Sequence, residues 1–242
     1  MDIRELVAQR SDLSTFLVHL TRDSESGVVA GAALKSIISS GLLEARSVYG
    51  HARNRLQKGG WETMSQRCVC FTETPLEYTH LLLADIDNRD VHFKPYGIAI
   101  TKRVGRGLGV NPVWYLDITP GHPWIAANLD RLLDRTLSEG RFTDPDVERL
   151  APFIEHMGTR LDEEGRQIYR KEFWWECEWR FCGGHFALPQ RFIGLCPEEH
   201  IAGFERLAAD VGRPARFIDP RWGLERIIAQ LAVFQADEVE IL

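Results

Sequence analysis

The sequence predicts an α+β protein with a helical insertion and an α/β extension at its C-terminal end. Short stretches in which apolar and polar residues alternate indicate half-buried strands, and segments such as 28–40 repeat apolar residues at helical spacing. The 242 residues, 44% hydrophobic and 26% charged, are enough for one large core. We therefore expect a single domain over residues 1–242, with the insertion at about 122–166 and the extension at about 195–242.

Bulk properties narrow the classes of function. The net charge of -6 argues against a globally basic nucleic-acid binder, although a local basic patch remains open. The sequence has no run of 18 apolar residues and no signal-peptide core at its start, so we expect a cytoplasmic chain without a membrane partner. The five cysteines fit neither a disulfide framework nor a zinc spacing, which favours buried, reduced thiols and predicts no metal site.

The first elements are a strand and a helix. In residues 16–21 the alternation predicts that Phe16, Val18 and Leu20 face the core, while His19 and Thr21 face the opposite side. The following segment, 28–40, predicts a helix that ends at Gly41.

A basic segment follows at residues 46–67. It has one acidic residue, Glu62, against five basic ones: Arg46, Arg53, Arg55, Lys58 and Arg67. Two interpretations stay open, a grip on the phosphates of a dinucleotide or nucleic acid and a solvated loop.

The middle of the chain alternates again between strands and helices. Residues 67–73 predict a buried strand, and the capping box at 74–77 predicts a helix to about residue 84. Strands are expected at 96–102 and 113–117, joined as a hairpin by the glycine-rich residues 105–109, because G-x-G-x-x-G spacing is absent. Two helices then fill the insertion, one ended by Gly140 and one starting at Asp144.

The most informative stretch is 172–181, which we predict to be one strand. Its alternation puts Glu176, Glu178 and Arg180 on one face over an aromatic core face. Two carboxylates side by side need a compensating charge, which Arg180 could supply. The alternative is the solvated face of an edge strand. After this stretch, the extension predicts a strand at 191–195, a helix after Pro197, a strand near residue 216, a helix after Pro220 and a last strand toward residue 242.

With these residues in view, a family resemblance emerges. A strand with His-x-Thr, a Cys-Phe-Thr-Glu strand and a late Glu-x-Glu strand resemble the order of the ADP-ribosyltransferases. The local sequence resembles even more the bacterial AbiGi-type abortive phage resistance family, which is similar in fold to nucleic-acid-modifying transferases of the DarT type. The phrases that carry this resemblance are FLVHLT (16–21), CVCFTETPL (68–76), GIAITK (97–102), NPVWYL (111–116) and EWR (178–180).

The resemblance implies a fold, an activity and a set of residues. It implies an ADP-ribosyltransferase-like split β-sheet core and an NAD-dependent mono-ADP-ribosyltransferase, a toxin–antitoxin or abortive-infection protein of phage defence. The catalytic residues would be Glu178 and Glu176. The substrate NAD would be held by His19, Thr21, Phe71, Thr72, Arg53, Arg55, Arg67 and Arg180.

The sequence departs from the family in the middle strand, where no tyrosine is placed to stack on nicotinamide, and Phe71 is the expected substitute. The implied partners are NAD, an RNA or DNA acceptor and a cognate toxin or antitoxin protein. Two other functions stay open: a non-catalytic, antitoxin-like binding module and an NAD glycohydrolase.

Overall fold

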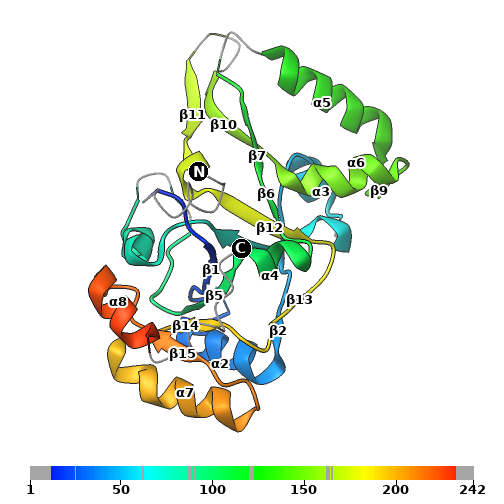
Figure 1. The fold of residues 1–242 in the computed structure, drawn as a ribbon. Coiled ribbons are helices and arrows are strands. Elements are labelled where there is room, and N and C mark those ends of the chain that lie inside the picture. Colours follow the sequence, from blue (N-terminus) through cyan, green and yellow to red (C-terminus); the bar gives the residue numbers. More distant parts are fainter. Residues whose placement is uncertain are drawn as a thin grey trace, which may run out of the picture. The chain divides into compact units, whose positions relative to one another are not determined.

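The computed structural model shows an α+β protein with a mixed eight-stranded sheet (Figure 1). It describes residues 12–24, 26–61, 63–86, 89, 91–119, 123–161, 164 and 166–232. The chain forms two compact units, which we describe separately. The first unit contains residues 1–43, 71–109 and 187–242, and the second contains 44–70 and 110–186. The single domain over 1–242 stays a prediction.

The first unit is built on the strand order β15-β14-β5-β1, followed by the end of β4. β5 lies antiparallel between β1 and β14, whereas β14 and β15 are parallel. Its strands are β1 (Phe16–Leu20), β5 (Gly97–Thr101), β14 (Ile193–Leu195) and β15 (Arg216–Ile218). Its helices are α2 (Ala30–Ser40), α4 (Lys102–Gly107), α7 (Ile201–Asp210), α8 (Leu224–Leu231) and the 3-10 segments η2 (Leu76–Leu83) and η5 (Glu198–His200).

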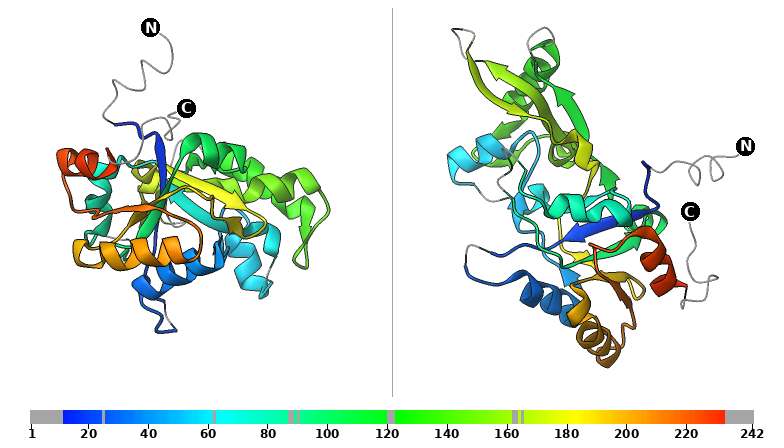
Figure 2. Two further views of the ribbon diagram at one scale, coloured as in Figure 1. Left: turned by 60° about the horizontal axis from the view of Figure 1, so that its bottom comes forward. Right: turned by 90° about the vertical axis from the view of Figure 1, so that its left-hand side faces the viewer.

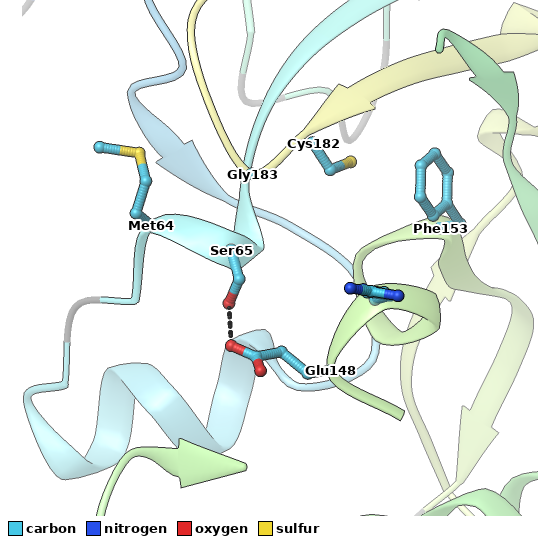
Figure 3. A pocket seen from close by; sticks show the side chains of 7 residues that line it. Met64, Ser65, Glu148, Phe153, Cys182 and Gly183 are labelled. Carbon is cyan, nitrogen blue, oxygen red and sulfur yellow. Dashed lines mark hydrogen bonds between the residues drawn. The ribbon is translucent and has the colours of Figure 1, made fainter. Parts of the chain in front are cut away.

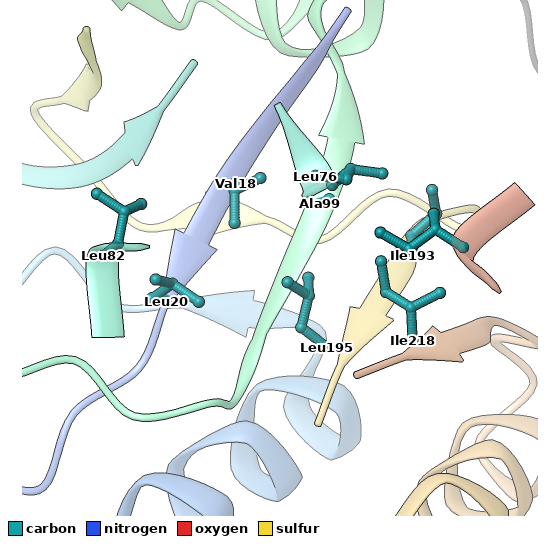
Figure 4. Close-up of a cluster of buried hydrophobic side chains, with 9 residues drawn as sticks. Val18, Leu20, Leu76, Leu82, Ala99, Ile193, Leu195 and Ile218 are labelled. Atoms are coloured by element: carbon teal, nitrogen blue, oxygen red, sulfur yellow. The ribbon is translucent and has the colours of Figure 1, made fainter. Parts of the chain in front are cut away.

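Helices cover both faces of this part of the sheet. Val18, Leu20 and Ala99 point to one face, where they form a cluster with side chains of η2, α8, β14 and β15 (Figure 4). The alternate residues Leu17 and Ile98 are fully buried on the other face. On that face Phe217 of β15 stacks on Phe204 of α7, and α7 runs beside α2 (Figure 2).

This two-sided burial changes the prediction for β1. Leu17 has no exposed surface, so β1 is a central strand rather than a strand with one polar face. Phe16 and His19 are half-buried. Thr21, expected opposite the core, is only 5% exposed. The strand itself and the helix 28–40 ending at Gly41 (φ 69°) are confirmed.

Among its described residues, the second unit has two larger groups of strands, one short hairpin and three α-helices. β4 (Arg67–Thr72), which begins in this unit, lies between β3 (Ser47–Val48) and β12 (Glu178–Cys182), and β12 pairs with β6 (Asn111–Pro112). A three-stranded sheet has β10 in the middle, parallel to β7 and antiparallel to β11. The strands of this sheet are β7 (Trp114–Asp117), β10 (Ile154–Leu161) and β11 (Gln167–Lys171), and a separate hairpin is formed by β8 (Leu137–Ser138) and β9 (Arg141–Phe142). The α-helices are α3 (Arg53–Gly59), α5 (Pro123–Thr136) and α6 (Pro145–Leu150). The 3-10 segments are η1 (Met64–Gln66), η3 (Ala151–Phe153) and η4 (Phe173–Glu176). Of two further short strands, β2 (Leu42–Leu43) belongs to the first unit, and β13 (Phe186–Ala187) lies where the second unit ends along the chain.

The insertion is only partly helical. α5 and α6 confirm its two helices, and Asp144 caps α6 by accepting from the N–H groups of Asp146 and Val147. The rest is wrong, because residues 154–161 form a strand that pairs with β7 and β11. Isoleucine, methionine and leucine in that stretch fit a strand as well as a helix, so only the partner strands decide between them.

The glycine-rich residues 105–109 do not close a hairpin. They lie in and after α4, which starts at Lys102. Thr101 caps this helix, because its hydroxyl accepts from the Val104 N–H at 3.3 Å. β5 pairs with β1 and β14, whereas β7 pairs with β10, so consecutive strands are not neighbours here. Residues 76–83, predicted as an α-helix, form the 3-10 segment η2.

The extension 195–242 matches the prediction through α8. Its short strands β14 and β15 flank α7, and α8 follows Pro220. The last strand, predicted toward residue 242, lies outside the described residues.

Truncating the core of α2 tests this arrangement. Leu34 has no exposed surface, so Leu34→Ala should lower the free energy of unfolding by about 3 kcal/mol. Lys35→Ala, at an exposed position of the same helix, should change it by less than about 0.5 kcal/mol. Urea unfolding followed by circular dichroism measures both, and equal effects would contradict the burial of Leu34.

Candidate functional site

The stretch 172–181 is not one strand. Residues 173–176 form the 3-10 segment η4, and Cys177 then adopts a left-handed conformation (φ 44°, ψ 56°) before β12 begins at Glu178. The Cys177 N–H donates to the Trp174 carbonyl at 3.1 Å, which closes the turn. The predicted shared face of Glu176 and Glu178 is therefore wrong, because a strand's alternation does not extend through a helical turn.

The aromatic face predicted for this stretch is also wrong. Of the residues predicted on that face, Trp175 is 38% exposed and Cys177 is exposed, and the other three, Phe173, Trp179 and Phe181, are only partly buried. The buried residue of β12 is Arg180, which is 1% exposed. The face that the sequence predicted to be polar therefore contains a buried guanidinium, that of Arg180.

Arg180 is the centre of a buried polar cluster. Its Nε and Nη2 donate to the two oxygens of Glu178, each at 2.9 Å, and Nη2 also donates to Glu155 Oε2 at 2.9 Å. Nη1 donates to the Pro152 carbonyl at 2.6 Å, and the guanidinium lies 4.9 Å from the centre of the Tyr49 ring. A guanidinium donates in a planar fork that suits this bidentate carboxylate contact.

The outer side of the cluster is Lys171 of β11. It donates to Glu155 Oε1 at 2.8 Å, so Glu155 is held between Lys171 and Arg180. Burial acts to raise the pKa of Glu155, but the positive charges of Arg180 and Lys171 outweigh it and hold the pKa at about 2. The pKa of Arg180 is raised above its usual range: burial acts to lower it, and the charge of Glu178 overcomes this effect.

Glu178 keeps room for a ligand. A carboxylate has about four lone-pair positions. Arg180 occupies two, and the Cys70 thiol makes a further hydrogen bond to this side chain. The side chain of Glu178 is still 16% exposed. The result is a carboxylate fixed in one orientation and open to solvent on one side.

Tyr115 and Val113 complete the backbone setting of Glu178. The Val113 N–H donates to the Glu178 carbonyl at 2.9 Å, and the Glu178 N–H donates to the Tyr115 hydroxyl at 3.4 Å. Burial, and then the charge of Glu178, raise the pKa of Tyr115, so this phenol stays neutral.

In the first unit, His19 and Phe71 lie together. The pairing of Val18 with Thr72 places His19 directly opposite Phe71, and their rings meet edge to face with centroids 5.8 Å apart. Phe71 is 2% exposed, so a nicotinamide could reach no more than a small part of its ring. The Thr72 hydroxyl lies 2.7 Å from that of Thr74.

Thr21 serves the fold. Its hydroxyl donates a hydrogen bond that is shared between the carbonyl oxygens of Ala30 and Tyr96, each 3.1 Å away. It therefore joins the end of β1 to the start of α2 and to the segment before β5, and its burial leaves little surface for a ribose.

The basic segment is structured, and Arg46 and Arg55 in it pair with carboxylates. Arg55 on α3 donates to Asp130 and Asp134 on α5, at 2.9 and 3.0 Å. Arg46 pairs with Glu44, and Arg53 lies 5.7 Å from the centre of the Tyr49 ring. Arg67 is half-buried at the start of β4. The interpretation as a solvated loop is wrong, and Arg55 would have to leave two carboxylates to bind a pyrophosphate.

A second polar group lies in the same unit. His51 Nδ1 and His156 Nε2 are 2.9 Å apart, and His51 Nε2 lies 3.3 Å from Asp130 Oδ1 without hydrogen-bond geometry. Burial, and then the neighbouring His156, lower the pKa of His51. Among the described residues, no set of three or more His, Cys, Asp or Glu side chains is arranged to hold a metal ion.

A pocket of about 440 Å³ opens near the end of β12 (Figure 3). Ser65 donates to Glu148 across it at 2.6 Å. Its lining residues are Met64, Ser65, Glu148, Arg149, Phe153, Cys182 and Gly183. None of them was a predicted site residue.

The ion pair of Arg180 with Glu178 confirms the predicted compensation, but the sequence missed the other members of the cluster. Glu155 and Lys171 lie on β10 and β11, and Tyr49 precedes α3; no motif marks any of them. Recognising 154–161 and 167–171 as adjacent strands would have been the only signal, because it is their pairing that brings Glu155 and Lys171 together.

No protein-family model, curated protein or solved structure matches the chain. No helix among the described residues is long and apolar enough to cross a membrane.

Acid should weaken the second unit through Glu155. A carboxylate with a lowered pKa stabilises the folded state above its unfolded pKa of about 4.5 and loses that effect as the pH falls toward the folded pKa of about 2. The contribution is on the order of 3 kcal/mol at neutral pH, of which roughly 2 kcal/mol is lost by pH 3. The free energy of unfolding of Glu155→Gln should therefore approach that of the wild type between pH 6 and pH 3, measured by urea titration.

The control for this experiment is Glu44→Gln, which removes an exposed carboxylate of the same unit. Its pH profile should run parallel to that of the wild type. A Glu155→Gln profile that also runs parallel would show that Glu155 carries no lowered pKa.

Proposed function

We propose that the protein is an NAD-dependent mono-ADP-ribosyltransferase of phage defence, with Glu178 as its catalytic carboxylate. The observation that carries the proposal is the state of this carboxylate. Two hydrogen bonds from the buried Arg180 fix it, and part of it remains exposed.

A fixed carboxylate suits this chemistry for an electrostatic reason. When nicotinamide leaves NAD, positive charge develops on the ribose, and a negative group already in place stabilises that charge without reorganising. In this assignment Glu178 stabilises the charge and accepts a hydrogen bond from a ribose hydroxyl. Arg180 orients Glu178 rather than binding NAD.

Strain next to Glu178 supports the assignment. Cys177 holds a left-handed backbone conformation that costs a residue with a side chain on the order of 1 kcal/mol. Such residues are concentrated at functional sites. Here the strained residue sets the point at which β12, and with it Glu178, begins.

Exposed tryptophans favour a nucleic acid as the acceptor. Trp174 and Trp175 lie in the turn that leads to Glu178, and Trp114 follows Val113, whose N–H bonds the Glu178 carbonyl. Trp114 is 51% exposed. Exposed aromatic rings provide surfaces on which nucleobases stack, at about 1–3 kcal/mol per base.

A second candidate function is a non-catalytic, antitoxin-like binding module. The two negative charges of the cluster, Glu178 and Glu155, are neutralised by two positive charges, Arg180 and Lys171. A cluster that serves only the fold shows the same charge balance, which favours the binding module. In that case the chain leaves NAD intact.

Glu178→Gln should lower ADP-ribosyl transfer at least about a hundredfold, because it removes the negative charge while keeping the shape of the side chain. The assay incubates the purified chain with NAD labelled in its adenylate, alone and with single-stranded RNA, single-stranded DNA or cell lysate. Label on a macromolecule identifies transfer, free ADP-ribose identifies a glycohydrolase, and intact NAD identifies the binding module.

The matched control is Glu164→Gln, which makes the same change at an exposed carboxylate of the same unit that pairs with Arg166. It should keep wild-type turnover. A melting curve for each variant separates lost chemistry from lost folding, and full turnover by a folded Glu178→Gln variant would remove Glu178 from the catalytic role.

A further inference from the structure

Two thiols of the second unit face each other across neighbouring strands. Cys68 Sγ on β4 lies 2.8 Å from Cys182 Sγ on β12. This separation is longer than a disulfide bond, which is about 2.05 Å. Both cysteines are free thiols in the structure.

The strand register suits a covalent link between them. The Gly183 N–H donates to the Arg67 carbonyl at 3.1 Å, which places Cys182 opposite Cys68. In an antiparallel pair, the position next to a hydrogen-bonded pair is a non-hydrogen-bonded one, where Cα atoms are about 4.5 Å apart. That separation lies within the range of about 4.4–6.8 Å that disulfides span.

We propose that Cys68 and Cys182 are a redox modification site, at which a hydroperoxide converts the two thiols into a reversible disulfide. The inference does not depend on the proposed transferase activity. It rests on the facing thiols, on their register and on the access of one of them to the pocket.

The two cysteines have different roles in the reaction. Cys182 lines the pocket (Figure 3) and is half-buried. Cys68 is 4% exposed. The hydrogen bond to Cys182 and burial raise the pKa of Cys68 well above its usual range. Cys182 is therefore the thiol that meets the oxidant, and Cys68 is the one that resolves the product.

The chemistry balances in two steps. The Cys182 sulfur, having lost its proton, attacks one peroxide oxygen, the O–O bond breaks, and a sulfenic acid and an alcohol (water, from hydrogen peroxide) form. The Cys68 sulfur then attacks the Cys182 sulfur, the S–O bond breaks, and the hydroxyl leaves as water with the Cys68 proton. Two electrons pass from the two thiols to the peroxide.

The disulfide would tie β4 to the strand that carries Glu178 and Arg180. A cross-link between residues so far apart in sequence restricts the unfolded chain, so the oxidised protein should melt at a higher temperature. A thiol reductant should return the melting temperature to its original value.

The test adds hydrogen peroxide to the reduced, folded full-length chain and then blocks the remaining thiols with an alkylating reagent. The expected result is a mass decrease equal to two hydrogen atoms before alkylation, and a fall from five free thiols to three. Trypsin should release a cross-linked pair of peptides, 68–89 and 181–191, which separates on reduction.

Serine variants identify the pair. Cys182→Ser and Cys68→Ser should each abolish the cross-linked peptides and the rise in melting temperature. Cys70→Ser and Cys177→Ser should keep both, and Cys177→Ser is the control for a reactive surface thiol because Cys177 is exposed.

Three outcomes would overturn the proposal. They are a cross-link that survives in Cys68→Ser or Cys182→Ser, a Cys182 oxidised to sulfinic acid while Cys68 remains a thiol, and a peroxide-treated wild type that keeps five thiols. Each variant is examined by mass spectrometry as well as by its melting temperature. If one variant fails to fold, the wild-type peptide map and the other variants still test the proposal.

Discussion

The burial of Arg180 is the constraint on which the second unit depends. A guanidinium that is 1% exposed needs hydrogen-bond partners and counter-charges within the protein, because removing it from water without them costs several kcal/mol. Glu178, Glu155 and the Pro152 carbonyl are those partners, and they come from β12, β10 and the turn before it. The polar cluster thus fixes the strands that carry it.

The same constraint gives Glu178 its character. A surface glutamate samples several rotamers, whereas this one is held on both oxygens by Arg180 and approached by the Cys70 thiol. The order is already present before any ligand binds, and this is what electrostatic catalysis requires. A purely structural ion pair has the same fixed geometry, so a measurement of NAD turnover distinguishes a catalytic Glu178 from a structural one.

β12 combines three kinds of group within five residues. Glu178 is partly exposed, Arg180 is buried and Cys182 lines the pocket. Residues two apart in a strand share a face, so the carboxylate, the guanidinium and the thiol lie in one row, opposite Cys70 and Cys68 of β4. A strand with a conventional apolar face could not bring a charge pair and a thiol pair so close together.

The sequence by itself determined the α+β class, the helix 28–40, the strands at 16–21 and 67–73 and most of the extension, because period, caps and glycine stops are local signals. It did not determine that 154–161 is a strand, that residues 173–176 turn, or that Arg180 is buried. Each of these depends on partners distant in the chain: β7 and β11 for the first, the strands β4 and β6 that pair with β12 for the second, and Glu155 for the third. Only the tertiary structure supplies those partners, because burying a charge is favourable only where another part of the chain brings its counter-charge.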